Sequence, residues 1–124
     1  MKYFRGIIFS CMLIMSGFQA NSQEESTSKT LYHVLLIQWS EGHDSNIKAE
    51  IIELFKGLPS KVEGFDNIDI LDLTISTEKF DTIIIQEYRS EEALQQYQEH
   101  PDHLRIAKIA PKVLSSMSKF DYWK

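Results

Sequence analysis

Seven consecutive residues near the end of the chain bring together side chains that can move protons: Tyr97-Gln98-Glu99-His100-Pro101-Asp102-His103. A residue before proline is disfavoured in the α-helical region, so a helix that contains Tyr97 is expected to end near His100. Pro101 suits the first turn of a following helix, because its missing N–H would have no partner there. The spacing therefore predicts two helices that meet at a structural corner made by His100 and Pro101.

This corner could carry acid–base chemistry. His103 falls in the first turn of the second helix, where the positive end of the helix dipole disfavours an imidazolium and keeps the ring neutral. A neutral imidazole can take a proton, and the Tyr97 hydroxyl can donate a hydrogen bond to a carbonyl group in the same cavity. Tyr97 and His103 are therefore the candidate catalytic residues. A structural interpretation fits the same pattern, with Tyr97 in the core, His100 as a helix cap and His103 in solvent.

Hydrophobic periodicity places the corner in a small α+β domain. Pro111 is expected to kink the helix that follows the corner. We predict, in order, a strand at 31–39, a helix from Asp44 or Ser45 to Gly57, strands at 65–73 and 82–88, a helix capped by Ser90, a second helix from Pro101 to about Met117, and a strand at 120–123. The order βαββαβ predicts a ferredoxin-like fold, with an antiparallel sheet and helices on one side.

Two of the predicted strands, 31–39 and 82–88, are apolar on both faces. The helices can cover only one face of the sheet, so a monomer would expose a large apolar surface. The simplest solution is a two-fold homodimer in which two sheets face each other and form an α/β barrel, with a cavity near each corner.

His33 is the polar exception on the first strand, since it shares a face with Leu35 and Ile37. A buried imidazole needs partners for its ring nitrogens. His33 therefore either hydrogen-bonds to a neighbouring element or lines a ligand pocket.

The N-terminus has the pattern of a secretory signal peptide at residues 1–20. Lys2 and Arg5 precede an apolar run that is too short to span a bilayer, and small residues follow it. We expect cleavage near Ala20, a flexible leader at 21–30, and a periplasmic or extracellular mature protein. The alternatives are an uncleaved anchor and a lipid attached to Cys11.

Cleavage would remove Lys2, Arg5 and the only cysteine, so the net charge would move from −5 to −7. A chain without a thiol has no disulfide, no thiolate nucleophile and no cysteine-bound metal. Its acidity argues against nucleic acid and anionic lipid as partners. We expect no metal, no cofactor and no stable membrane association of the mature protein.

The chain resembles the stress-responsive α/β-barrel (Dabb) domain family over nearly the whole of residues 31–124. The matching segments are His33-Val34-Leu35-Leu36, Pro59 and Gly64, Tyr97 with His100-Pro101-Asp102-His103, and Phe120-Asp121-Tyr122. The resemblance implies a homodimeric barrel of ferredoxin-like subunits. In one branch, the plant polyketide cyclases of the olivetolic acid type, a cofactor-free aldol condensation uses residues that match Tyr97 and His103, and a histidine matching His33 lines the pocket.

These observations support two main hypotheses. The first is an exported homodimer that binds a small organic ligand and acts as a cofactor-free lyase, cyclase or isomerase through Tyr97 and His103. The second is a non-enzymatic stress or stability protein of the same fold, and a related third is a cofactor-free monooxygenase-like dimeric barrel. A pocket that touches His33, Tyr97 and His103 would favour the first hypothesis, and a filled interior the second.

Overall fold

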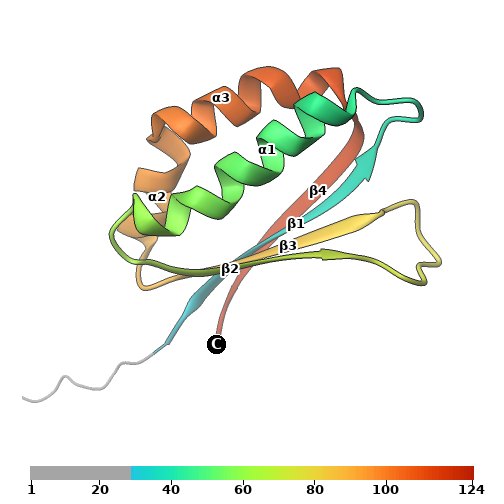
Figure 1. Ribbon diagram of the computed structural model, residues 1–124. Coiled ribbons are helices and arrows are strands. Elements are labelled where there is room, and N and C mark those ends of the chain that lie inside the picture. Colours follow the sequence, from blue (N-terminus) through green and yellow to red (C-terminus); the bar gives the residue numbers. More distant parts are fainter. Residues whose placement is uncertain (1–28) are drawn as a thin grey trace, which may run out of the picture.

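The computed structural model describes residues 29–124, which form one antiparallel four-stranded sheet with helices on one face (Figure 1). The sheet order is β2-β3-β1-β4. The elements, in chain order, are β1 Leu31–Trp39, α1 Ser45–Gly57, the 3-10 turn η3 Leu58–Ser60, β2 Phe65–Asp72, β3 Thr82–Tyr88, α2 Glu91–Glu99, α3 Pro101–Ile109, the 3-10 turn η4 Ala110–Lys112 and β4 Leu114–Trp123. The predicted ferredoxin-like fold is confirmed. The predicted signal peptide at 1–20 and most of the predicted leader at 21–30 lie outside the described residues.

Local sequence signals explain where the helices begin. The Asp44 side chain accepts hydrogen bonds from the N–H groups of Asn46 and Ile47, which caps α1. Ser90 caps α2 in the same way by accepting from the N–H of Ala93. Within residues 29–124, no helix is both long and apolar enough to cross a bilayer.

The core lies between the helices and the inner face of the sheet. Because strand side chains alternate between faces, every second residue of β1, from Leu31 to Trp39, points into this core and is buried. Ile51 and Phe55 of α1 and Ile106 and Ile109 of α3 pack onto it. The sheet thus fixes where its inward-facing polar side chains, among them His33, meet the helices.

The C-terminal part of the prediction is wrong. The helix after the corner ends at Ile109 rather than near Met117, and β4 begins at Leu114, six residues before the predicted strand. Pro111 has no N–H and its ring clashes with the carbonyl group four residues earlier, so it stops the helix rather than kinking it. The chain then pairs with β1 from Leu114 to Trp123, and a bulge between Gln38 and Trp39 adjusts the register.

The outer face of the sheet carries a cluster of apolar side chains that no helix of residues 29–124 covers. Phe120 is 49% exposed, Tyr122 is 43% exposed and its ring stacks on that of Tyr32 at 4.9 Å. The strand register places these residues on one face together with other apolar side chains. We call the whole cluster the outer sheet face, and its members are Tyr32, Val34, Leu36, Leu71, Ile83, Ile85, Phe120 and Tyr122. Thr30 extends the β1–β4 ladder by exchanging two backbone hydrogen bonds with Lys124.

Gly64 is the glycine that the turn before β2 requires. Its φ is +86°, and a Cβ at this position would lie 2.8 Å from the Cβ of Ala93. We expect Gly64→Ala to lower the free energy of unfolding by about 2–4 kcal/mol, since it combines a left-handed backbone with overpacking. Urea denaturation at fixed protein concentration measures this loss.

Gly42 provides the matched control, because its φ is also positive, at +69°, but its Cβ would meet nothing within 4 Å. Gly42→Ala should cost only the backbone strain, about 1 kcal/mol. Equal losses for the two variants would contradict the packing argument.

Candidate functional site

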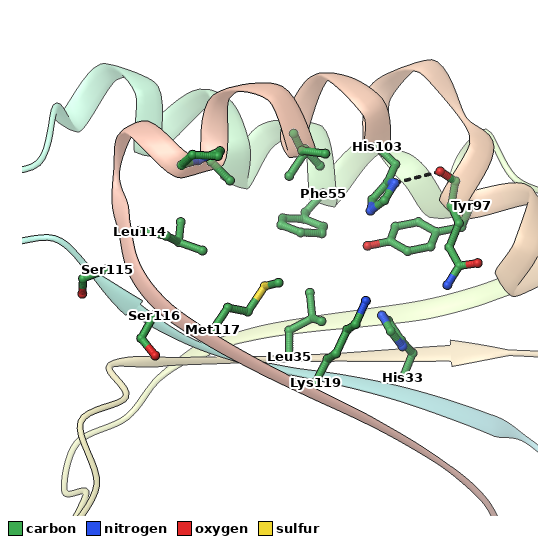
Figure 2. A pocket seen from close by; sticks show the side chains of 15 residues that line it. His33, Leu35, Phe55, Tyr97, His103, Leu114, Ser115, Ser116, Met117 and Lys119 are labelled. Atoms are coloured by element: carbon green, nitrogen blue, oxygen red, sulfur yellow. Dashed lines mark hydrogen bonds between the residues drawn. The ribbon is translucent and has the colours of Figure 1, made fainter.

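A pocket of about 570 Å³ opens between the helices and the inner face of the sheet (Figure 2). His33, Tyr97 and His103, which the sequence singled out, all line it. The remaining lining residues come from β1, α1, α2, α3, η4 and β4. Most are apolar: Leu35, Phe55, Ile106, Ala107, Ala110, Pro111, Leu114 and Met117. The polar ones are Gln98, Ser115, Ser116 and Lys119. His100 and Pro101 are not among the lining residues.

His100 forms the corner between the two helices that hold Tyr97 and His103. Its backbone is extended, its N–H donates to the carbonyl of Tyr97, and its Nδ1 accepts from the N–H of Asp102 at 3.0 Å. It therefore closes α2 and caps α3. Lys61 donates to Asp102 at 2.7 Å and lowers the pKa of that carboxyl, which ties the start of α3 to the turn after η3.

His103 is held so that one ring nitrogen is free. Its Nδ1 lies 2.9 Å from the carbonyl oxygen of Gln98, and because a carbonyl only accepts, Nδ1 carries the proton. The other nitrogen of the neutral ring then has a lone pair, and Figure 2 shows it directed into the pocket. Burial is the main cause that lowers the pKa of His103 below its ordinary value, and the nearby charges of His33 and Lys119 lower it further. The helix dipole was predicted to keep this ring neutral, whereas burial is the main cause that lowers its pKa.

Tyr97 lies beside this ring, with 4.5 Å between the two ring centroids. The Tyr88 hydroxyl donates to Gln86 Oε1 at 2.6 Å, which fixes the amide so that Gln86 Nε2 donates to the Tyr97 oxygen at 3.3 Å. Because Gln86 donates to the Tyr97 oxygen, the hydroxyl proton of Tyr97 is not used in this bond and can be donated to a ligand in the pocket. Burial raises the pKa of Tyr97 to about 12, so the phenol stays protonated at neutral pH and can act as a hydrogen-bond donor.

His33 rises from β1 toward the edge of the Tyr97 ring, 5.9 Å away between centroids. Its Nδ1 lies 2.5 Å from Asp121 Oδ1 on the paired strand β4. A carboxylate accepts, so this contact orients the imidazole. His33 thus both lines the pocket and bonds to a neighbouring strand, which were the two roles predicted for it.

Lys119 and Gln86 were not predicted as site residues from the sequence. Lys119 lines the pocket, and Figure 2 shows its ammonium group directed toward Tyr97 and His33. It was overlooked because the predicted strand began at Phe120. Within the observed β4, the alternation of Met117, Lys119 and Asp121 places all three on the face that also carries His33. Gln86 alternates with Ile84 and Tyr88 on β3, so its burial was detectable by the reasoning applied to His33.

A family model described as the stress responsive A/B barrel domain (Dabb) matches residues 31–124. The chain belongs to this family. The resemblance stated from its motifs is therefore confirmed. No curated protein matches the sequence.

Solved structures of similar fold include several that are described as dimeric. A dimeric ferredoxin-like protein from Bacteroides fragilis is 21% identical, with a TM-score of 0.60, covering 75% of this chain and 94% of that one. Another from Thermobifida fusca is 21% identical, with a TM-score of 0.64, covering 84% and 98%. The hydroxynitrile lyase from Passiflora edulis is 12% identical, with a TM-score of 0.67, covering 77% and 93%. At these identities the likeness concerns the fold.

In the part of the chain that the structure describes, no group of three or more His, Cys, Asp or Glu side chains is placed to hold a metal ion. The polar chemistry of this Dabb domain is instead gathered in the pocket. It consists of a phenol, two imidazoles, an ammonium group, one side-chain amide and two hydroxyl groups on otherwise apolar walls.

Proposed function

We propose that this Dabb protein binds a small, mainly apolar carbonyl compound and removes a proton from the carbon beside its carbonyl group, as a cofactor-free lyase, cyclase or isomerase. One observation carries the proposal. The free ring nitrogen of His103 and the hydroxyl of Tyr97 face the same pocket, and neighbouring groups fix the proton on each. A base and a hydrogen-bond donor at adjacent positions are what enolisation needs.

In this mechanism the substrate carbonyl oxygen accepts a hydrogen bond from Tyr97. His103 takes the proton from the neighbouring carbon, and the electron pair moves onto the carbonyl oxygen, where the Tyr97 hydroxyl stabilises the negative charge. The bond from Nδ1 to the Gln98 carbonyl stabilises the resulting imidazolium. His103 then returns the proton to the product.

The pocket supports this function over the purely structural hypothesis. A stability protein has no need for a cavity whose walls combine a buried phenol with an imidazole of lowered pKa. The Passiflora edulis hydroxynitrile lyase adds support of a weaker kind, because an enzyme named as a lyase shares the fold. No feature of the described residues specifically favours the monooxygenase-like alternative.

The reaction class can be tested without knowing the natural substrate. The protein is incubated in D₂O with aryl ketones, 1,3-diketones and 2-oxo acids, and deuterium incorporation beside the carbonyl is followed by NMR. We expect faster incorporation than in buffer for at least one class of compound. Mass spectrometry of small molecules that copurify with the protein then narrows the class. A wild-type protein that accelerates exchange in none of them would contradict the proposal.

The pH dependence of this exchange follows from the site. His103 acts only when unprotonated, so the rate should fall as the pH drops through the pKa of His103, which lies below the ordinary value of 6.5. Tyr97 acts only when protonated, and its pKa of about 12 places the alkaline loss beyond the usual assay range. A pH–rate profile should therefore show a plateau through neutral pH with its acid limb below 6.5. An acid limb above that value would argue against His103 as the base.

We also propose that the protein is a two-fold homodimer that joins through the outer sheet face. The apolar side chains of that face, with Phe120 and Tyr122 about half exposed, support this assembly. Structural neighbours described as dimeric support it as well. The pocket lies on the opposite face, so each subunit would keep its own site.

We also propose that the protein is exported by a signal peptide at residues 1–20. We expect the protein to be recovered outside the cytoplasm with a new N-terminus near Asn21, because Lys2 and Arg5 precede an apolar run of signal-peptide length. Cell fractionation followed by intact-mass measurement tests this. Recovery of unprocessed chain from the cytosol would contradict it.

A further inference from the structure

Lys119 brings an unpaired positive charge into the apolar pocket. It lies on β4 opposite Leu35, and Figure 2 shows its side chain rising from the sheet into the space below His103 and Tyr97. None of the ion pairs formed within residues 29–124 includes Lys119. Asp121, the carboxylate two residues along the same face, is engaged by His33.

The charge of Lys119 acts inside the site. Figure 2 shows its ammonium group directed toward Tyr97 and His33, and its charge adds a lesser contribution to the lowering of the His103 pKa, which is mainly due to burial. The other lining residues are apolar or uncharged polar residues and the two histidines, so the pocket wall offers no anion. Lys119 is exposed, so its ammonium group is accessible and available to pair with an anionic group on a ligand.

We propose that the ligand is a carboxylate, with its acid group bound by Lys119 and its carbonyl group placed at Tyr97 and His103. An oxo acid whose carboxylate and carbonyl groups lie close together would satisfy both Lys119 and the Tyr97–His103 pair, with its apolar body lying against Leu35 and Phe55. This inference rests on the proposed function and names its substrate class. The charge of Lys119 would also offset the negative charge that develops on the enolate.

The test compares two probes of nearly equal size, 3-phenylpropanoate and its uncharged analogue 3-phenylpropanamide, by calorimetric titration of the full-length protein. We expect the wild type to bind the acid about tenfold more tightly than the amide. The factor is modest because the ion pair between Lys119 and the carboxylate would be partly exposed to solvent. Lys119→Met should abolish this preference by weakening binding of the acid far more than binding of the amide, and Lys119→Arg should retain the preference. Lys108→Met, on the exposed side of α3, makes the same change in net charge and should have no effect.

The outcomes separate this inference from the proposed function. Equal binding of acid and amide by the wild type, or a preference that survives Lys119→Met, would overturn the role of Lys119 and leave the pocket as a ligand site. Binding of neither probe to the wild type would overturn both the ligand pocket and the carboxylate inference. A preference that is lost in Lys119→Met and kept in Lys108→Met would support the inference.

Discussion

We expect His103→Ala to lower the rate of deuterium exchange beside the substrate carbonyl by about 10²- to 10⁴-fold, the usual cost of losing a general base. His103 is only partly buried and its one described hydrogen bond is to the Gln98 carbonyl, so the melting temperature should change little. NMR exchange rates and thermal melts on the same samples separate the two effects.

Tyr97→Phe should also lose activity, because it removes the hydroxyl that faces the carbonyl. It has a stability cost as well, since Tyr97 is 1% exposed and its loss leaves the buried Gln86 amide short of a partner, at about 1–3 kcal/mol. Tyr88→Phe is a matched control, because it removes the other phenol bonded to Gln86 but lies outside the pocket lining. Tyr88→Phe should share the stability loss but, because it keeps the Tyr97 hydroxyl, it should lose less activity than Tyr97→Phe.

His100→Ala should behave in the opposite way to His103→Ala. It removes the cap of α3 and should lower stability by about 1 kcal/mol while the folded protein stays active. If the substitutions at Tyr97, His100 and His103 all lowered the melting temperature and none changed exchange, the corner would be a folding device and the catalytic hypothesis would be wrong.

Substitution of Phe120, on the outer sheet face, should have a large effect on dimer formation. We expect light scattering of the wild type at micromolar concentration to give twice the mass of one chain, and Phe120→Glu to give the mass of a monomer. A two-fold interface repeats the substitution, so two carboxylates would lose their hydration on association, at a cost of several kcal/mol each. That cost raises the dissociation constant by more than about a thousandfold.

Leu104→Glu is the control for this prediction. Leu104 is a similarly exposed apolar residue, at 56%, but it lies on α3, away from the outer sheet face. The substitution adds the same charge and should leave the dimer intact. A wild type that is a stable monomer, or a Phe120→Glu variant that remains dimeric, would refute assembly through this face.

Much of the fold was predictable because its signals are local. The cap at Asp44, the alternating burial of β1 and the proline at the corner each involve residues only a few positions apart. The start of β4 was not predictable. Its first half contains Ser115, Ser116 and Ser118, which break the alternation of apolar and polar residues that marks a strand. The residues from Val113 to Met117 also fit a helical spacing. What makes this segment a strand is its pairing with β1, which lies far away in the sequence.

In the candidate site, too, the residues marked by local signals were predictable and those that depend on long-range contacts were not. His33, Tyr97 and His103 were identified from residue type, spacing and family resemblance, and the structure places all three on one pocket. Their partners were not identified, because the contact of His33 with Asp121 joins residues 88 positions apart and depends on strand register. Lys119 could be recognised as a pocket residue only once the start of β4 was known.

The alternation of β4 limits how this Dabb domain can change during evolution or engineering. Lys119 and Asp121 belong to the pocket side of the strand, and Phe120 and Tyr122, one position away, to the outer sheet face. Inserting or deleting one residue between Leu114 and Lys119 would exchange the two sets, because a one-residue slip turns every later side chain to the opposite face. Aromatic rings would then fill the pocket, and a lysine and an aspartate would project from the outer face. Substitutions can therefore tune the pocket and the outer face separately, whereas a change in the length of this strand damages both at once.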